Sequence, residues 1–282
     1  MPKQTAIAGI ALAVGLALVC GAATAQDRQK ITIATEGAYP PWNSTDSAGQ
    51  LIGFDIDLAK DLCARMEVEC EIVAQDWEGI IPALQAGKYD AIMAGMSITE
   101  ERKEVINFSD SYRTTPAKFA VLEGSELAEA DLPTDVLDLS TIEPEEEQAI
   151  EALRQALEGK TVGVQVATIH QNFLEDQLGD VVEVRRYDTQ ENLDLDLQAG
   201  RIDTALADTG YWIPLMETEK GEDFTLIGPG LSKGPFGEGV GVGLRKEDED
   251  LREMFNQAIA EAKEDGTISE LGKQWFGFDA EA

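Results

Sequence analysis

The sequence is poor in basic residues and in histidine. Lys and Arg together number 22 of the 282 residues against 54 Asp and Glu, which gives a formal net charge of −32, and there is one histidine. Nucleic-acid binding needs a basic surface that displaces the counterions of the phosphates, so this charge excludes it. The same charge disfavours docking on an anionic bilayer. Because hydrophobic residues make up 43% of the chain, we interpret the acidity as a solvated surface and not as disorder.

Long apolar runs are also scarce. The main one, residues 6–19, has 14 residues, whereas a membrane-spanning helix needs about 20. Lys3 precedes this run, and Ala-Thr-Ala at 23–25 places small residues at the positions that signal peptidase reads. This layout predicts that residues 1–25 are a cleaved secretory signal. We therefore expect an exported, periplasmic protein that is not embedded in a membrane.

Cysteine is rare, with three residues in the whole chain. Cys20 as a lipid anchor is an alternative to the cleaved signal, but Val19 stands where lipoprotein peptidases require a small residue. Cys63 and Cys70 remain after cleavage. Because an exported chain meets an oxidising compartment, we expect these two to form a disulfide, with free thiols as the alternative. A zinc site is disfavoured because His170 is the only histidine and no second cysteine pair is present.

Short β-rich runs alternate with helical patterns along the chain. An apolar residue recurs at every fourth position from Phe54 to Met66, which predicts a helix, and residues 251–262 predict another that ends near 265–266. This alternation predicts an α/β fold of parallel sheets with helices on their faces. The candidate strands are residues 31–35, 70–74, 91–95, 161–166, 181–187 and 205–207.

Two stretches depart from this alternation. Residues 123–158 contain 12 acidic residues and one basic residue. Within them, residues 145–158 predict an exposed amphipathic helix and the preceding part a loop, so we interpret the stretch as a solvated insertion. Residues 237–243 have glycine at every second position. They lack the spacing and the strand-turn-helix context of a nucleotide-binding loop, and they predict a flexible, extended segment.

Several segments resemble one known family. They read ITIATEGAYPPWN from residue 31, LIGFDIDLAKDLCARM from residue 51 and YDAIMAGMSITEER from residue 89, with GVGVGLRKED late in the chain. In this order they resemble the solute-binding proteins of polar amino-acid ABC transporters (family 3). The lysine/arginine/ornithine- and histidine-binding group is the most similar, together with its octopine- and nopaline-binding relatives. The resemblance extends over residues 31–279.

The resemblance implies a two-lobed, type II periplasmic binding protein fold. Each lobe is expected to be α/β, a mostly parallel sheet flanked by helices, with the ligand between the lobes and two crossing hinge segments joining them. The implied boundaries are residues 26–115 plus 232–282 for lobe one, 116–231 for lobe two, and 114–118 and 230–236 for the crossings.

The resemblance also assigns residues to the head group of a basic amino acid, whose charges each need a partner in a dry cleft. Arg102 is assigned to the α-carboxylate, because a guanidinium forms two parallel hydrogen bonds with it; a surface arginine paired with Glu100 or Glu101 is the alternative. Asp208 is assigned to the α-ammonium, with a helix-capping aspartate as the alternative. Further head-group contacts are expected from Ser97, the Gly95 carbonyl, and the helix start at Thr168 and Ile169.

The ligand's side chain is expected to lie among aromatic rings and an acid. The resemblance assigns its terminal cation to Glu36 and its aliphatic stem to Tyr39 and Trp77, which can stack on a cation. Tyr39 lies among prolines, which favours an exposed aromatic, whereas a core tryptophan is the alternative for Trp77. Gln165 is expected at the far end of the pocket, and His170 on a helix surface or at the pocket rim.

The implied function is capture of a cationic amino acid, arginine, ornithine, lysine or histidine, for delivery to the permease subunits of an ABC transporter. The expected protein is a monomer without cofactor, metal or catalytic residues. An opine, a basic amino acid with a substituted α-nitrogen, is the first alternative ligand, although Asp208 and Ser97 suit a free amino acid. An exported dehydratase acting on prephenate or arogenate is the second alternative.

Overall fold

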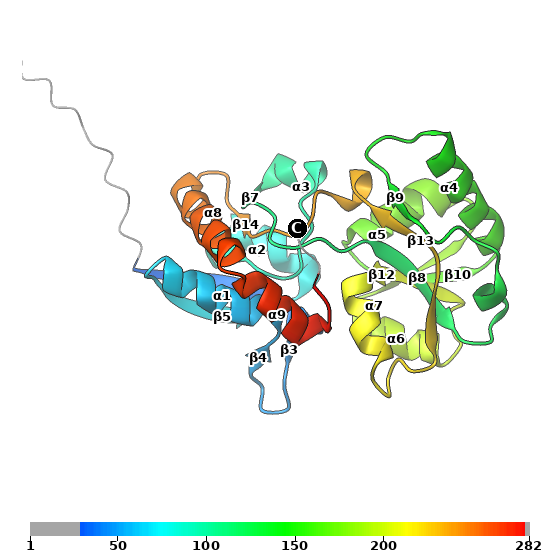
Figure 1. Cartoon of the computed structure of the whole chain (residues 1–282), viewed down its shortest axis with the longest axis horizontal. Coiled ribbons are helices and arrows are strands. Elements are labelled where there is room, and N and C mark those ends of the chain that lie inside the picture. The colour runs from blue at the N-terminus through cyan, green and yellow to red at the C-terminus, as the bar shows by residue number, and fades with distance from the viewer. Residues whose placement is uncertain (1–28, 280–282) are drawn as a thin grey trace, which may run out of the picture.

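The computed structural model describes residues 29–279, and these residues form two α/β lobes that lie side by side (Figure 1). The predicted signal, residues 1–25, lies outside the described residues. The chain passes between the lobes twice, from β7 (Asn107–Phe108) to β8 (Ala117–Leu122) and from β13 (Phe224–Ser232) to β14 (Gly243–Leu244). The fold is that of a type II periplasmic binding protein, as predicted.

The sheet of lobe one has the strand order β5-β1-β6-β14-β7. Its remaining strands are β1 (Lys30–Thr35), β5 (Glu69–Ala74) and β6 (Ala91–Ile92). β1 pairs in parallel with β5 and β6, whereas β14 is antiparallel to both β6 and β7. The helices of this lobe are α1 (Phe54–Arg65), α2 (Ile80–Gln85), α3 (Glu100–Val105), α8 (Glu249–Glu264) and α9 (Thr267–Phe276).

The sheet of lobe two has the strand order β11-β10-β12-β8-β13-β9. β10 pairs in parallel with β11 and β12, β9 pairs in parallel with β13, and β8 is antiparallel to its two neighbours. The further elements of this lobe are β9 (Val136–Asp138), β10 (Thr161–Gln165), β11 (Glu183–Tyr187), β12 (Thr204–Asp208), α4 (Pro144–Leu157), α5 (Ile169–Phe173), α6 (Gln190–Gln198) and α7 (Thr209–Met216).

All six predicted strands are present, and the expectation of mostly parallel sheets is confirmed. Both sheets are nevertheless mixed, because β8 and β14 enter them antiparallel to their neighbours immediately after a crossing between the lobes. A strand that follows a crossing enters its sheet from the side of the crossing, and here its direction is opposite to that of the neighbouring strands. The alternation of strands and helices along the sequence does not reveal this change of strand direction.

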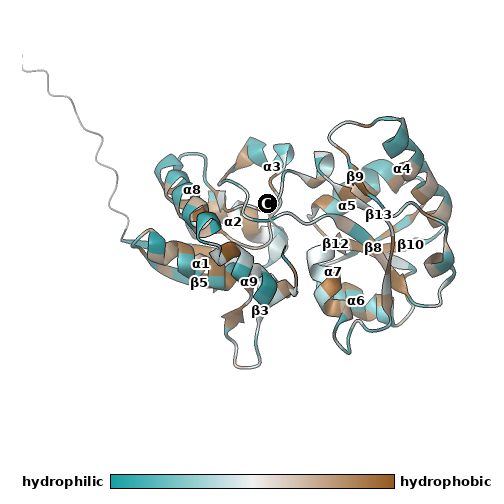
Figure 2. Cartoon of the chain, viewed as in Figure 1, coloured by the Kyte–Doolittle hydropathy of each residue, from teal (hydrophilic) through white to brown (hydrophobic). Residues whose placement is uncertain are grey.

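The acidic stretch 123–158 is part of lobe two; it contains the predicted amphipathic helix, but the part predicted as a loop includes a strand. Its residues 136–138 form β9, which pairs with β13 at the edge of the sheet. The predicted helix is present as α4, whose outward face is hydrophilic in Figure 2, while Leu153 and Leu157 are fully buried. Because acidic residues alternate with buried leucines, the acidity is confined to the solvent side of a packed segment.

The glycine-rich segment 237–243 is extended, as predicted, but it is packed within lobe one. Val240 forms β-bridges with both Ser97 and Arg113 and is 1% exposed. A Cβ atom at Gly237 would stand 2.3 Å from the Ile98 carbonyl oxygen, and Gly237 has a φ of +78°. The glycine is therefore required by close approach of two backbones at the point where the chain returns to lobe one.

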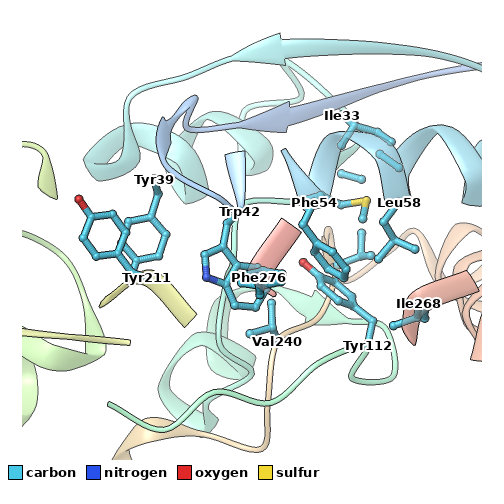
Figure 3. Close-up of a cluster of buried hydrophobic side chains, with 14 of the residues drawn as sticks. Ile33, Tyr39, Trp42, Phe54, Leu58, Tyr112, Tyr211, Val240, Ile268 and Phe276 are labelled. Atoms are coloured by element: carbon cyan, nitrogen blue, oxygen red, sulfur yellow. The ribbon is translucent and has the colours of Figure 1, made fainter. Parts of the chain in front are cut away.

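Aromatic side chains fill the core of lobe one next to the junction with lobe two. Trp42 and Phe54 meet Phe276 of α9 edge to face, with ring centroids 4.8 and 5.2 Å from Phe276 (Figure 3). Phe276 of the last helix thus packs against aromatic residues from the start of the chain, and this contact places α9 in lobe one. The strand β5 is fixed to α1 by the predicted disulfide, Cys63–Cys70, with a Cα–Cα distance of 6.1 Å.

A small hairpin sheet precedes α1 and carries one margin of the cleft. It consists of β2 (Ala38–Tyr39), β3 (Asn43–Thr45) and β4 (Leu51–Ile52), and its β3–β4 loop projects from lobe one in Figure 1. Among residues 29–279, none of the helices is both long and apolar enough to cross a bilayer.

Candidate functional site

A pocket between the two lobes contains every ligand-contact residue that the sequence predicted. It lies where β1, β6, β10 and β12 end, the edge at which open α/β sheets bind ligands. Loops that leave parallel strands at the same edge converge there, which brings together residues distant in sequence. The lining residues are Glu36, Tyr39, Trp77, Ala94, Gly95, Ser97, Arg102, Gln165, Thr168, Ile169, His170, Gln190 and Asp208.

Arg102 is a buried cation on the lobe-one side of the pocket. It belongs to α3, which Thr99 caps by accepting a hydrogen bond from the Arg102 amide. The guanidinium donates through Nη1 to the Ser97 carbonyl at 2.9 Å and lies 5.3 Å from the centre of the Trp77 ring. Burial lowers its pKa to about 10, against the attraction of Glu101 and Asp208, so the group stays charged at neutral pH. The alternative of a surface arginine is wrong, because Arg102 is 9% exposed.

Asp208 is the matching anion on the lobe-two side. It ends β12, is 6% exposed, and accepts a hydrogen bond from the Tyr39 hydroxyl of lobe one at 3.0 Å. His170 Nε2 lies 3.5 Å from Asp208 Oδ1. Asp208 occupies the N-cap position of α7, but its side chain makes no capping hydrogen bond. The capping alternative is therefore wrong, and the carboxylate faces the cleft.

Glu36 lies in another part of the lining, on the loop that follows β1. Gln165 of lobe two donates to its carboxylate at 2.6 Å and also to the Asp188 carbonyl at 3.2 Å. Burial, together with the negative charge of Asp76, raises the pKa of Glu36 to about 7, while the hydrogen bond from Gln165 opposes the shift. A cation placed next to Glu36 would favour the ionised form.

The two predicted aromatic contacts are both at the junction of the lobes. Figure 3 shows Tyr39 stacked on Tyr211 of α7; the ring centroids are 4.7 Å apart, and Tyr39 is 8% exposed. The expectation of an exposed Tyr39 is thus wrong, because the opposite lobe covers its ring. Trp77 is not a pure core residue either, since its Nε1 donates to the Ala167 carbonyl of lobe two at 3.1 Å.

Direct hydrogen bonds therefore join the two lobes across the pocket. Three of them use lining groups: Tyr39 to Asp208, Gln165 to Glu36, and Trp77 to the Ala167 carbonyl. A fourth, from Asn172 Nδ2 to Glu101 Oε2 at 2.8 Å, lies at the exposed rim. The groups with which a polar ligand would interact are thus also the groups that hold the lobes together.

A buried polar network behind the pocket was not found from the sequence. The Asp55 carboxylate accepts hydrogen bonds from Asn43 at 3.1 Å and from the Tyr112 hydroxyl at 2.8 Å, and it also bonds the Gly95 amide. Asn43 in turn accepts from the Gly37 amide at 2.7 Å. The network joins the loop of Glu36 to the loop of Gly95. The sequence does place Asp55 in the first turn of α1. Aspartates are common at that position, however, and the sequence does not reveal that this one is buried.

Lobe two contributes three further residues to the lining. Thr168 caps α5 by accepting from the Gln171 amide, and its hydroxyl donates to the Gln165 carbonyl at 2.8 Å. Gln190 was not predicted; it lines the pocket while its amide donates to Asp194. His170 is part of the lining, with 6% exposure, and not on a helix surface.

Comparison with known proteins shows the family to which this chain belongs. A model of the bacterial extracellular solute-binding proteins, family 3, matches residues 31–278. The octopine-binding periplasmic protein of Rhizobium meliloti is 41% identical over 282 residues, covering 94% of this chain and 95% of the relative. The histidine-binding periplasmic protein of Salmonella typhimurium is 37% identical over 276 residues, covering 96% and 97%.

A solved structure agrees with these relatives. An ancestral arginine-binding protein bound to arginine matches with a TM-score of 0.73 at 31% identity, covering 89% of this chain and 99% of that one. The resemblance read from the sequence is thereby confirmed, and the two-lobed architecture with its pocket between the sheets accords with it. This chain belongs to the bacterial extracellular solute-binding proteins of family 3.

Proposed function

We propose that this protein binds a cationic amino acid in the cleft between its lobes and delivers it to the permease of an ABC transporter. The observation that carries the proposal is the placement of three charged groups in one lining: Arg102, Asp208 and Glu36. Arg102 and Asp208 attract each other across the cleft, whereas Glu36 interacts with Gln165 and Asp76. This inventory, one cation and two anions, is complementary to a zwitterion with an additional positive tip.

The proposed pose follows from the charges. Arg102 forms paired hydrogen bonds with the α-carboxylate, supported by the Ser97 hydroxyl and by the main chain at Thr168 and Ile169. Asp208 holds the α-ammonium together with the Gly95 carbonyl. Glu36, with Gln165, receives the terminal cation. Each buried charge then has an opposite charge beside it, without which desolvation would cost several kcal/mol.

Closure of the lobes is the proposed mechanical step. Two crossing segments connect the lobes, and rigid lobes joined in this way close by hinge motion around a ligand. The proposed division is residues 26–115 plus 232–282 for one rigid unit and 116–231 for the other. The closed form, with its cross-cleft hydrogen bonds, is the form that a permease would recognise.

The proposed site of action is the periplasm, reached through cleavage of residues 1–25. The periplasmic location of the octopine- and histidine-binding relatives supports it. We propose no catalytic role, since the named relatives are binding proteins. Absence of phenylpyruvate formation from prephenate would support this choice over a dehydratase.

An opine is the second candidate ligand. The observation that favours it is the 41% identity with an octopine-binding protein. Octopine keeps the guanidinium and the α-carboxylate of arginine and adds a carboxylate-bearing substituent on the α-nitrogen. The same Arg102 and Glu36 contacts would serve both ligands, and the surroundings of Asp208 would decide between them.

The experiment is a thermal-shift screen of the purified protein against the common amino acids and octopine, followed by calorimetry. A ligand at about 100 times its Kd is expected to add about 2.7 kcal/mol to the free energy of unfolding. Arginine, ornithine, lysine or histidine should raise the melting temperature, with glutamine, leucine and glutamate as controls. A preference for neutral or acidic amino acids would contradict the proposal.

A further inference from the structure

Gln190 is a buried polar side chain in the pocket lining that the proposed pose does not use. It is the first residue of α6 and is 1% exposed. Its Nε2 atom donates to Asp194 Oδ1 at 3.2 Å, whereas its Oε1 atom accepts no hydrogen bond within the part of the chain that the structure describes. Buried amide oxygens in native proteins normally accept a hydrogen bond, so this one is available to a bound ligand.

Asp194 and Tyr211 determine which end of the Gln190 amide faces the pocket. Asp194 Oδ1 accepts from Gln190, and its Oδ2 accepts from the Tyr211 hydroxyl. An amide turned the other way would place two oxygens against each other, so the nitrogen stays on Asp194 and the oxygen is left for the pocket. Gln190 therefore presents an acceptor whose orientation is set by contacts within lobe two.

Other contacts place Gln190 at the end of the pocket that is assigned to the ligand's tail. Gln165 donates both to Glu36 and to the carbonyl of Asp188. Asp188 precedes Gln190 by two positions. Burial, and to a smaller extent the charge of Glu36, raises the pKa of the Tyr211 hydroxyl, which places Glu36 near this group as well. This end of the lining thus has a carboxylate acceptor from lobe one and an amide acceptor from lobe two.

Two acceptors on opposite lobes match a guanidinium better than an ammonium. A guanidinium carries five N–H donors on a planar fork, so one edge can pair with the Glu36 carboxylate while an N–H on another edge reaches Gln190. The ammonium of lysine or ornithine offers its donors from a single atom, which Glu36 can pair with as a point charge. In a dry pocket, a guanidinium N–H without an acceptor would lower the affinity. The amide oxygen of Gln190 therefore favours arginine.

We propose that Gln190 is a specificity-determining residue that accepts a hydrogen bond from the guanidinium of a bound ligand, so that the cleft prefers arginine to lysine and ornithine. This inference rests on the proposed function, since it uses the place that Glu36 gives to the terminal cation. It adds a selection among cationic amino acids, which the charges of Arg102, Asp208 and Glu36 leave equal. Asp194 is the positioning residue for the Gln190 acceptor.

The test is calorimetry of the full-length mature protein with L-arginine, L-lysine and L-ornithine. The unmodified protein should bind arginine at least about tenfold more tightly than the other two, since a hydrogen bond to a charged group contributes about that factor or more. Gln190→Met keeps the length of the side chain without the acceptor and should weaken arginine binding by about tenfold. The affinities for lysine and ornithine should change by less than about threefold, because neither ligand uses this acceptor.

Two further variants separate recognition from folding. Gln190→Asn keeps an amide but shortens the side chain by one methylene, so it should also lower the preference for arginine. Gln198→Met changes an exposed glutamine at the end of the same helix and should leave all three affinities unchanged. Melting temperatures check that the variants are folded.

The outcomes separate this inference from the proposed function. Binding of lysine or ornithine as tightly as arginine by the unmodified protein would overturn the inference and leave the proposed function standing. Equal weakening of all three ligands by Gln190→Met would also overturn it, because Gln190 would then act only through the packing of lobe two, as would an unchanged preference for arginine in that variant. Binding of no cationic amino acid would overturn both.

Discussion

The two lobes present differently organised faces to the cleft. On lobe one, Arg102 is anchored by the Ser97 carbonyl of its own lobe, and the loops of Glu36 and Gly95 are tied together through the Asp55 network. On lobe two, two polar lining groups have partners across the cleft. Asp208 accepts from Tyr39, and Gln165 donates to Glu36.

This difference implies that the two faces contribute to ligand binding at different stages. Arg102 and the loops of Glu36 and Gly95 keep their positions when the lobes separate, because the contacts that hold them are internal to lobe one. They can therefore hold a head group before closure. Asp208 and Gln165 of lobe two acquire their lobe-one partners only on closure, so they contribute to the stability of the closed form. The following predictions test this division, beginning with the largest effect.

Arg102→Ala should abolish the main contribution of lobe one to ligand affinity. Truncating one partner of a buried, hydrogen-bonded charge pair costs about 2–5 kcal/mol, so arginine binding measured by calorimetry should weaken by about 30-fold to about 5,000-fold. Arg252→Ala is the matched control, since Arg252 pairs with Glu249 on α8 away from the pocket. A change of less than threefold for Arg102→Ala would refute its role.

Asp208→Asn, on lobe two, should reduce ligand affinity less than Arg102→Ala. The substitution keeps the size of the side chain and an acceptor for Tyr39 but removes the charge that would hold the α-ammonium. Hydrogen bonds to charged groups are worth about 1.5–3 kcal/mol, which corresponds to a loss of affinity of about 30-fold. Asp176→Asn, at an exposed position of the same lobe, is the control. If Asp208→Asn weakens binding more than Arg102→Ala, the assignment of tasks to the lobes is reversed.

Glu36 should make arginine binding depend on pH. Its pKa of about 7 means that the ionised fraction rises from about a tenth at pH 6 to about nine tenths at pH 8, so the Kd should fall by up to about tenfold. Glu36→Gln should flatten this profile. Asp194→Asn should preserve it, because Asp194 also has a pKa raised to about 7 by burial but does not line the pocket.

The same group has the opposite effect on the stability of the protein without ligand. Because the pKa of Glu36 is higher in the folded than in the unfolded chain, the folded state binds more protons between about pH 4.5 and 7. Stability should therefore decrease as the pH rises through this window. Glu36→Gln should reduce that decrease in urea titrations at pH 5 and pH 8. An identical pH dependence in both proteins would contradict the pKa shift.

Much of the fold could be predicted because the signals are local. The apolar spacing of α1 and α8 and the short β-rich runs specify elements without knowledge of their neighbours. β8 and β13 are not among the predicted strands, and the acidic surroundings of β9 predict a loop there. The direction in which a strand enters a sheet depends on where the chain crosses between lobes, and no local pattern encodes that crossing.

In the candidate site, too, some features could be predicted from local sequence and others could not. Arg102 and Asp208 follow recognisable motifs, so their presence in the cleft could be predicted. The burial of Tyr39 and of His170 could not, because each depends on a residue supplied by another element. Tyr39 is covered by Tyr211, and His170 packs against Phe236 from the returning crossing segment.

The residue types and their local spacing along the chain specify which charges the cleft contains and which elements carry them. Which of these groups meet depends instead on how the two lobes are folded and placed. Tyr39 and Asp208 are 169 positions apart, and Glu36 and Gln165 are 129 positions apart. Contacts of this kind arise from two separately folded sheets facing each other, and the energy of each contact depends on the water that their closure excludes.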